Sequence, residues 1–398
     1  MRKRGARTGL VLLLLSVLLL VQVALASPPF AATPSAVAHA NAAPSYSTML
    51  TPANAAALNA SDALLLPVPA PVSVALAGYF RGVNLFGPWQ SAWGEPDAFP
   101  TTAQLDYYES KGLTTFRAPV LWEHLQPVLL GPLDPAYLSR MDLLVAEAMA
   151  RREHVIFTFI NQGLYPARTG QVIGSAAAPV TAFTNVWQQL AIHYRDNAGV
   201  WAYDLMNEPY HDAQWNVHAQ DAINAIRAVD SAKTIIVMPQ GEGSQGYRLQ
   251  NGFQGYRDPS NNLWYEAHIY FDRDGSGEYA GSYDAEGAYP MVGVDRAWPF
   301  VQWCHAHVVR CYVGEYGIPG GWTSGDMETT YGAPTNDPRW DTVLDNFLTY
   351  LDQYQISGTY WDAGPYGDID SVEPTNTGQD RPQMAILEKH LGTWTPGV

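Results

Sequence analysis

The segment at residues 200–210, Val-Trp-Ala-Tyr-Asp-Leu-Met-Asn-Glu-Pro-Tyr, predicts a buried strand that ends beside a carboxylate. Its first seven residues are apolar or aromatic except for Asp204, and Pro209 ends the strand because proline cannot donate a hydrogen bond to a sheet. Glu208 therefore stands at the carboxyl end of the strand, where parallel α/β folds place their reactive groups. The segment at residues 311–315, Cys-Tyr-Val-Gly-Glu, repeats this arrangement with Glu315.

Around these two segments, predicted strands alternate with predicted helices, which is typical of a parallel α/β fold. We expect strands at residues 80–86, 114–120, 155–161, 200–207, 234–239, 263–270, 311–315 and 358–361. We expect helices at residues 102–111, 136–152, 180–195, 214–229, 294–307, 340–354 and 381–391, while the helix after the fifth strand is only weakly indicated. This alternation predicts one (β/α)8 TIM barrel with some loop insertions.

The N-terminal part of the chain is expected to lie outside this barrel. Residues 1–26 combine a basic start, an apolar run and a small-residue cleavage site, so they predict a secretory signal peptide; an uncleaved membrane anchor is the alternative. Residues 27–75 are rich in Ala, Pro and Ser, carry Asp62 as their single charged residue, and predict a low-complexity linker. The barrel is then expected at residues 76–398, in a protein secreted outside the cell or into a periplasm.

The charge of the chain excludes some classes of partner. It has 22 Lys and Arg against 38 Asp and Glu, a net charge of −16. Residues 1–26 hold four basic and no acidic residues, so their removal would leave 18 basic residues and a net charge of −20. Such a surface repels nucleic acid and anionic membranes and suits a neutral partner such as a glycan, although a role in solubility alone is the alternative.

The two cysteines of the chain are Cys304 and Cys311. Export permits a disulfide between them, and the expected positions at a helix end and a strand start would bring them close; two buried free thiols are the alternative. Two cysteines without supporting spacing favour neither a metal cluster nor a cysteine nucleophile. We therefore expect no metal site.

Polar and aromatic side chains stand at the ends of most predicted strands, and a parallel barrel would bring them to one face. They are Arg117, Glu123, Asn161, Asn207, Glu208, His268, Tyr270, Glu315 and Trp361. Hydrolysis of a glycosidic bond needs such a set: a carboxylic acid to protonate the leaving oxygen, a carboxylate to attack or stabilise the anomeric carbon, and donors that tune both.

Six short motifs, in their order along the chain, resemble family 5 glycoside hydrolases. They are Arg-Gly-Val-Asn at 81–84, Phe-Arg-Ala-Pro at 116–119, Asn-Glu-Pro at 207–209, His-Ile-Tyr at 268–270, Gly-Glu-Tyr-Gly at 314–317 and Tyr-Trp at 360–361. The segments at 172–174, 183–187 and 271–277 further resemble the endoglucanase (cellulase) branch. The resemblance covers residues 78–391 and implies a clan A barrel enzyme that hydrolyses a polysaccharide or oligosaccharide with retention, most simply an endo-β-1,4-glucanase, without a cofactor. We expect it to act as a monomer.

The resemblance also implies individual roles in a double displacement. Glu208 would be the acid/base and Glu315 the nucleophile. Asn207 would hold the 2-hydroxyl of the sugar in subsite −1, while Arg117 and Tyr270 would hydrogen-bond Glu315 and lower its pKa. His268 would lie beside the acid/base, and Trp361 would form the floor of subsite −1.

One position departs from the family pattern. Ile160-Asn161 stands where the family has His-Asn, and Thr158 replaces the Asp that precedes this His by two residues. Since that His contacts the sugar in subsite −1, we expect substrate orientation, rate or sugar preference to differ, with Asn161 or Tyr165 in its place.

Further tryptophans near strand ends are candidate platforms for sugar stacking. They are Trp89, Trp93, Trp122, Trp215 and Trp322, of which we favour Trp89 and Trp122. Glu123 is expected to be structural.

Two alternatives stay open at this point. The same mechanism could act on mannan, β-1,3-glucan or a bacterial exopolysaccharide, in an endo or exo manner. A carbohydrate-binding protein on a degenerate barrel is the non-enzyme alternative. By contrast, the glycine-rich segment at 241–246 lacks a correctly spaced acid for a dinucleotide, and the calcium-like segment at 272–277 has Tyr283 where the twelfth position needs Glu.

Overall fold

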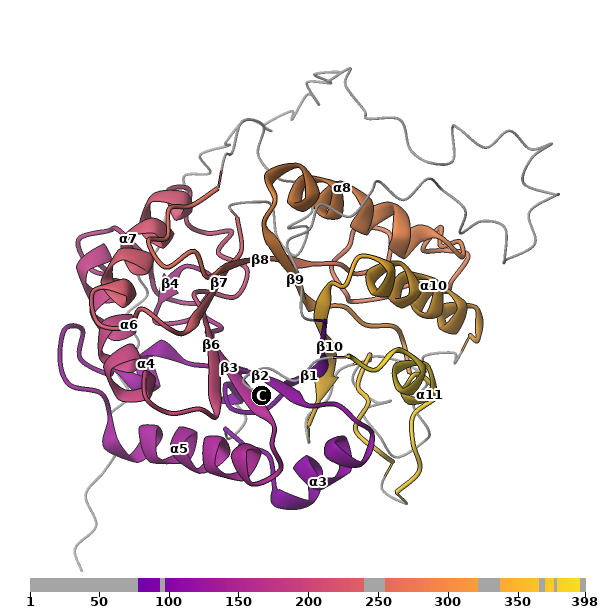
Figure 1. Ribbon diagram of the computed structural model, residues 1–398, viewed down its shortest axis with the longest axis horizontal. Helices are drawn as coiled ribbons and strands as arrows, with labels where there is room; N and C mark the ends of the chain where they lie inside the picture. Colours follow the sequence, from indigo (N-terminus) through magenta and orange to yellow (C-terminus); the bar gives the residue numbers. More distant parts are fainter. Residues whose placement is uncertain are drawn as a thin grey trace, which may run out of the picture. The chain divides into compact units, whose positions relative to one another are not determined.

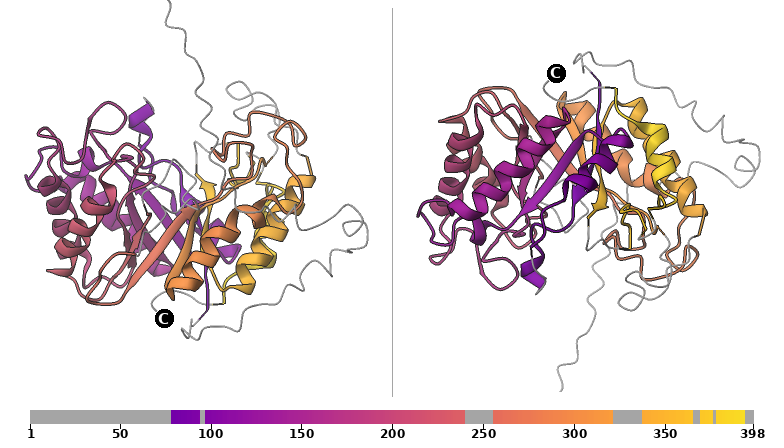
Figure 2. Two further views of the ribbon diagram at one scale, coloured as in Figure 1. Left: turned by 90° about the horizontal axis from the view of Figure 1, so that it is seen from above. Right: turned by 90° about the horizontal axis from the view of Figure 1, so that it is seen from below.

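A closed barrel of eight parallel strands forms the centre of the protein. The computed structural model describes residues 78–93, 97–239, 255–320, 337–364, 369–375 and 378–393. Within them the strands follow the order β1-β10-β9-β8-β7-β6-β3-β2, and the helices lie outside this ring (Figure 1). The side views show the strands running obliquely between the helices (Figure 2). The predicted (β/α)8 barrel is confirmed.

Each predicted strand overlaps one strand of the barrel. The strands are β1 (Arg81–Leu85), β2 (Thr115–Val120), β3 (His154–Phe159), β6 (Val200–Asp204), β7 (Thr234–Val237), β8 (Leu263–His268), β9 (Arg310–Glu315) and β10 (Ser357–Ala363). The loop after β3 contains a short pair of antiparallel strands that we did not predict, β4 (Leu164–Tyr165) and β5 (Gln171–Val172).

The predicted helices are also present, with shifts of a few residues at their ends. They are α3 (Thr102–Ser110), α5 (Pro135–Ala150), α6 (Val180–Tyr194), α7 (Trp215–Arg227), α8 (Val292–His307) and α10 (Arg339–Gln353). The last predicted helix is shorter than expected, because α11 (Met384–Leu387) continues as the 3-10 turn η2 (Glu388–His390). A four-residue helix, α4 (Trp122–Leu125), and the 3-10 turn η1 (Gln90–Trp93) follow β2 and β1.

Local sequence signals explain where these helices begin and which face they bury. Helix α3 starts with a capping box, in which the Thr101 hydroxyl accepts from the Gln104 backbone and the Gln104 side chain accepts from the Thr101 backbone. Helix α5 starts with Asp134 as N-cap and Pro135 in its first turn. Helix α10 buries residues three, four and seven positions apart against the barrel.

The inside of the barrel is layered by the two-residue period of its strands. Residues Ile156, Ala202, Trp264 and Tyr312 belong to one apolar cluster inside the barrel. Two residues further along their strands stand Thr158, Asp204, Glu266 and Gly314, nearer the carboxyl ends. Side chains at i and i+2 share one face of a strand, so the apolar layer lies beneath a layer that includes two acids.

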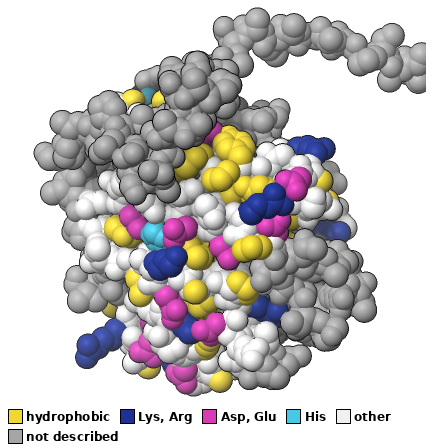
Figure 3. All heavy atoms as spheres, turned by 90° about the vertical axis from the view of Figure 1, so that its right-hand side faces the viewer, with side chains coloured by type: hydrophobic (Ala, Val, Ile, Leu, Met, Phe, Trp, Pro, Cys, Tyr) yellow, Lys and Arg dark blue, Asp and Glu magenta, His cyan; other side chains and the backbone are white. Residues whose placement is uncertain are grey.

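The outer part of the barrel carries a disulfide and a surface of mixed charge. A disulfide joins Cys304 of α8 to Cys311 of β9, whose Cα atoms are 6.3 Å apart. On the side where α10 lies, acidic and basic side chains are interspersed (Figure 3), and both Lys389 and His390 pair with Asp345. Among the described residues, no helix is both long and apolar enough to cross a membrane. The predicted signal peptide at 1–26 and linker at 27–75 lie outside the described residues.

Candidate active site

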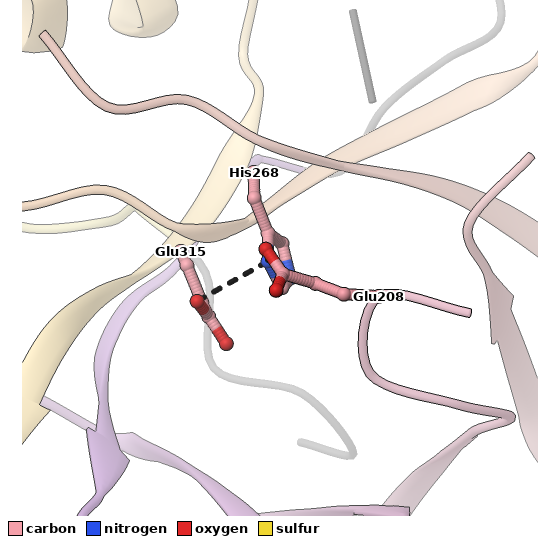
Figure 4. Close-up of side chains that lie close together, drawn as sticks. All are labelled: Glu208, His268 and Glu315. Carbon is pink, nitrogen blue, oxygen red and sulfur yellow. Dashed lines mark hydrogen bonds and ion pairs between the residues drawn. The ribbon is translucent and has the colours of Figure 1, made fainter. Parts of the chain in front are cut away.

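Glu208 and Glu315 meet at the carboxyl-terminal mouth of the barrel (Figure 4). Glu315 is the last residue of β9, and Glu208 lies in the loop after β6, where its φ of 42° is unusual for a residue other than glycine. One carboxylate oxygen of each lies within 4.8 Å of the other and of a ring nitrogen of His268. Two carboxyl groups at this separation can act on the same glycosidic bond.

Arg117 links Glu315, the candidate nucleophile, to the loop after β6 that carries Glu208. It lies on β2 with its side chain fully buried. Its Nη1 donates to Oε1 of Glu315 at 2.9 Å, and its Nη2 donates to Oδ1 of Asn207 at 3.0 Å. Nη1 also donates to Oδ1 of Asn84 at 2.9 Å. The rigid guanidinium fork therefore fixes the residue before Glu208 and the carboxylate of Glu315 at once.

The second oxygen of Glu315 is held by Tyr270 and His268. The Tyr270 hydroxyl donates to Oε2 at 2.9 Å. Nδ1 of His268 lies 3.2 Å from the same oxygen and 3.0 Å from Oε1 of Glu208. An irregularity in the pairing of β8 with β9 brings His268 into register with Glu315, which explains why this ring reaches both carboxylates.

The electrostatic surroundings favour an ionised Glu315. Burial alone would raise its pKa, but the charge of His268, the hydrogen bonds from His268 and Tyr270 and the charge of Arg117 hold the pKa below its ordinary value. Burial lowers the pKa of His268, whereas the charge of Glu315 and hydrogen bonds to Glu208 and Glu266 raise it well above its ordinary value. The site thus pairs an anionic Glu315 with a cationic His268.

A cleft opens above these residues and provides room for a substrate. Its walls combine aromatic, amide and acidic side chains. They are Trp89, Ile160, Gln162, Asn207, Glu208, Tyr270, Ser276, Gly277, Glu278, Glu315 and Trp361. A narrow aromatic wall beside a pair of carboxyl groups is what the binding and cleavage of a sugar chain require.

The sequence model of one family, Cellulase (glycosyl hydrolase family 5), matches residues 74–367. The chain belongs to glycosyl hydrolase family 5. It is a glycoside hydrolase, and the resemblance seen in its motifs is confirmed. The non-enzyme alternative is therefore set aside.

Relatives of this glycosyl hydrolase family 5 member include endoglucanases. Endo-beta-1,4-glucanase B of Emericella nidulans is 26% identical over 75% of this chain and 85% of its own length. Among solved structures, endoglucanase Cel5A of Pseudomonas stutzeri in complex with cellobiose is 32% identical, has a TM-score of 0.69, and matches 78% of this chain and 92% of its own. XacCel5A in complex with cellopentaose is 30% identical with a TM-score of 0.69, over 79% and 99% of the two chains.

Two residues that we expected to bind substrate have other contacts. Asn161 is 1% exposed, and its amide bridges the backbone N–H of Trp122 and the carboxylate of Glu123. Trp122 is fully buried against Tyr165 and Phe183, so it offers no face to a sugar. Glu123 is structural, as expected, since it also accepts from a backbone N–H in the loop after β3.

The replacement of the family His by Ile160 changes one wall of the cleft. Ile160, at the position of the family His, lies in an apolar cluster with Trp89, Leu121 and Ala167 and lines the cleft. Neither expected substitute for the His takes over its place, since the Tyr165 hydroxyl instead donates to a backbone carbonyl of the loop after β2. The wall at this point is apolar, and the neighbouring polar group is Gln162.

Of the other tryptophans, Trp89 lines the cleft beside Trp361. Trp215 is fully buried, with its indole N–H donated to the carbonyl of Met238. Nothing is described of the Trp93 side chain, and Trp322 and the glycine-rich segment at 241–246 lie outside the described residues.

Sequence reasoning missed several residues of the site. Gln162, Ser276 and Glu278 lie in loops whose conformation the sequence does not predict. Asp204 and Glu266 lie in strands, and an acidic residue inside an otherwise apolar strand could have indicated their importance. Within the described part of the chain, the one group of His and acidic residues close enough to hold a metal is Glu208, His268 and Glu315, which already bond one another.

Proposed function

We propose that this glycosyl hydrolase family 5 member is an exported, monomeric endo-β-1,4-glucanase that works by double displacement. The observation that carries the proposal is the close approach of Glu208 and Glu315, within 4.8 Å, around His268. Retaining glycosidases place their two carboxyl groups about 5 to 5.5 Å apart, whereas inverting enzymes need about 6.5 to 9.5 Å for an intervening water. The short separation supports retention.

In the first step, Oε of Glu315 attacks the anomeric carbon while the glycosidic bond breaks. Glu208 gives its proton to the leaving oxygen, so the leaving sugar departs as a neutral alcohol. In the second step, Glu208 takes a proton from water, which attacks the anomeric carbon and releases Glu315. Arg117 and Tyr270 hold the attacking carboxylate in place, since each donates a hydrogen bond of 2.9 Å to it.

The choice of β-1,4-glucan rests on the relatives. The relatives include endo-beta-1,4-glucanases, and two of the similar structures hold cellobiose or cellopentaose. The wall of the cleft has Ile160 where the family has a His, which keeps mannan, β-1,3-glucan and a bacterial exopolysaccharide as alternative substrates of the same mechanism. Export is supported by the signal-like residues 1–26.

The test is product release from a panel of soluble glycans. The panel contains carboxymethylcellulose, its uncharged counterpart hydroxyethylcellulose, mixed-linkage glucan, β-1,3-glucan and mannan. We expect oligosaccharides from the β-1,4-linked glucans, none with Glu315→Ala, and a β-configured hemiacetal as the first product in NMR spectra. Full activity of Glu315→Ala would contradict the mechanism, and turnover of mannan or β-1,3-glucan alone would contradict only the substrate.

A further variant separates the two acids. Glu208→Ala should cleave cellobiosides with good leaving groups, accumulate the glycosyl-enzyme, and regain turnover with azide by forming a β-glycosyl azide. Glu315→Ala should not form that β-product, because it cannot form the intermediate. Rescue of Glu315→Ala to the β-azide would reverse the assignment.

A further inference from the structure

Two buried acids lie beneath the catalytic pair and take no direct part in the proposed double displacement. Asp204 on β6 and Glu266 on β8 are both fully buried inside the barrel. Burial of an ionised carboxylate is costly unless cations or donors compensate for the lost water. The charges that these two acids contact therefore decide which of them is ionised.

Glu266 contacts both cations of the site through one oxygen. Its Oε1 lies 3.2 Å from Nε2 of His268 and 3.3 Å from Nη2 of Arg117. The backbone of β9 leaves room for this oxygen only because residue 314 is glycine, since a Cβ there would lie 1.7 Å from Oε1. The carboxylate of Glu266 is thus built against the strand that carries the nucleophile.

Asp204 also contacts Arg117, but its protonation state differs from that of Glu266. Its Oδ2 accepts from Nε of Arg117 at 2.9 Å, and its carboxyl group also forms a hydrogen bond with that of Glu266. Burial and the charge of Glu266 raise the pKa of Asp204 well above its ordinary value, against the opposing charge of Arg117. Burial would also raise the pKa of Glu266, but Arg117 and His268 hold it low. Asp204 therefore carries the proton and Glu266 the charge.

We propose that Glu266 is a positioning residue that keeps His268 cationic, and that this cation stabilises first Glu315 and then Glu208 during the reaction. The proposal rests on the proposed function. Glu266 binds one ring nitrogen, and the other ring nitrogen lies 3.0 Å from Glu208 and 3.2 Å from Glu315. The same N–H can therefore face whichever catalytic carboxylate is charged.

The charges of the site balance in each state of the proposed reaction. Before reaction, the anions Glu315 and Glu266 match the cations Arg117 and His268, Asp204 is neutral, and the acid role proposed for Glu208 requires that it carry a proton. In the first step, the bond from Glu315 to the anomeric carbon forms, the glycosidic bond breaks, and the proton of Glu208 goes to the leaving oxygen. The negative charge has moved from Glu315 to Glu208, and the sum is unchanged. Attack by water reverses the shift.

Two phenols also face this network and stay neutral. Tyr270 contacts Glu315, and Tyr312 lies near Arg117, Glu266 and Asp204. Burial raises the pKa of each well above its ordinary value, with the charge of Glu315 acting in the same direction on Tyr270. Neither phenol therefore changes the charge balance over the working pH range.

The test compares two isosteric substitutions in the full chain, Glu266→Gln and Asp204→Asn. The readout is the acidic limb of the pH profile of kcat/KM for 2,4-dinitrophenyl β-cellobioside, whose leaving group needs no proton. In Glu266→Gln we expect His268 to lose its proton, so that Glu315 loses a neighbouring cation and the acidic limb moves to higher pH by about 1 to 3 units. In Asp204→Asn the limb should stay in place, whatever the rate, because Asn mimics a protonated Asp.

Glu266→Asp, which keeps the charge, should return the limb toward its wild-type position. A limb that stays in place or moves to lower pH in Glu266→Gln would overturn the proposal, as would equal shifts in Glu266→Gln and Asp204→Asn. A wild-type protein without activity on any β-glycoside would instead contradict the proposed function.

A measurement on the unchanged protein tests the charge of His268, on which the proposal depends, if Glu266→Gln does not fold. The ring nitrogens of His268 can be followed by NMR in the 15N-histidine-labelled chain and assigned by their loss in His268→Asn. We expect the shifts of an imidazolium at pH 8. A neutral ring at pH 7 would overturn the proposal.

Discussion

The indole rings of Trp361 and Trp89 lie 6.2 Å apart between centroids, with their planes tilted by 31°, and together form one wall of the cleft. Phe86 makes T-shaped contacts with both rings and so helps to fix their orientation. Trp361 is partly exposed, whereas Trp122 has no exposed surface. Two tryptophans near the same end of the barrel therefore serve different purposes, one at the cleft and one in the core.

This difference predicts opposite outcomes for the same substitution. Trp361→Ala should lower kcat/KM on cello-oligosaccharides by about 10- to 100-fold, the equivalent of losing the contact of one aromatic ring, with little change in stability. Trp122→Ala should lower the free energy of unfolding by about 3 to 5 kcal/mol. Kinetics and urea unfolding of both variants check this. An unchanged kcat/KM in Trp361→Ala would contradict a role of Trp361 in binding.

Tyr210 offers an exposed ring next to the acid/base. Its ring is 44% exposed, and its hydroxyl donates at 3.0 Å to Gln162, which lines the cleft. Because Glu208 protonates the leaving oxygen, a platform beside it is expected to bind the leaving part of the chain. Tyr210→Ala should lower kcat/KM on cello-oligosaccharides by about 2- to 10-fold, but leave β-cellobiosyl fluoride, whose leaving group is too small to reach the ring, unaffected.

The matched control for this prediction is Tyr289→Ala. Tyr289 is 39% exposed and its hydroxyl also donates to a surface side chain, Asp295, but it lies just before α8 and outside the cleft. It should change neither activity. An equal loss on the fluoride and on the oligosaccharides in Tyr210→Ala would mean that the ring supports Glu208 rather than the leaving sugar.

The barrel and the central residues could be predicted because each depends on local sequence. An apolar run ended by a turn or a proline fixes a strand end, and a parallel barrel gathers all such ends at one mouth. Glu208, Glu315, Arg117, His268 and Tyr270 were placed together by this reasoning alone.

The sequence could not place residues whose contacts lie between loops. Asn161 also follows a strand, but its amide bonds to Trp122 and Glu123 from the preceding loop. No local pattern distinguishes an amide that faces the cleft from one that faces a neighbouring loop. The acids Asp204 and Glu266 could have been found, because each interrupts an apolar strand at an inward position.

The disulfide between Cys304 and Cys311 is expected to stabilise the fold without affecting catalysis. It closes a short loop with a sequence separation of 7 between α8 and β9. For a loop of this size, the entropy lost by the unfolded chain corresponds to about 2 kcal/mol. Wild type in reductant and the double variant Cys304→Ala/Cys311→Ala should both lose about this much, and the double variant should not respond to reductant. An unchanged free energy of unfolding would contradict the prediction.

Glu153 lies just before β3 and away from the cleft. We expect its titration to make the stability of the protein depend on pH. Glu153 is 1% exposed, and neither carboxylate oxygen finds a donor among the described residues. Burial and the charges of Glu109 and Asp106 raise its pKa to about 9, with Arg151 opposing them. The folded state therefore keeps a proton that the unfolded state releases at lower pH, so stability is lost as pH rises from the ordinary pKa of a glutamate toward about 9.

Glu153→Gln removes this titration and should make the protein more stable than wild type at neutral pH. The advantage should be small near pH 5 and grow by up to about 1.4 kcal/mol per pH unit toward pH 8. Urea unfolding at several pH values measures this difference, with Asp196→Asn, whose side chain is 92% exposed, as a control expected to change stability by less than about 0.5 kcal/mol. A difference between Glu153→Gln and wild type that does not vary with pH would show that Glu153 is ionised in the folded protein.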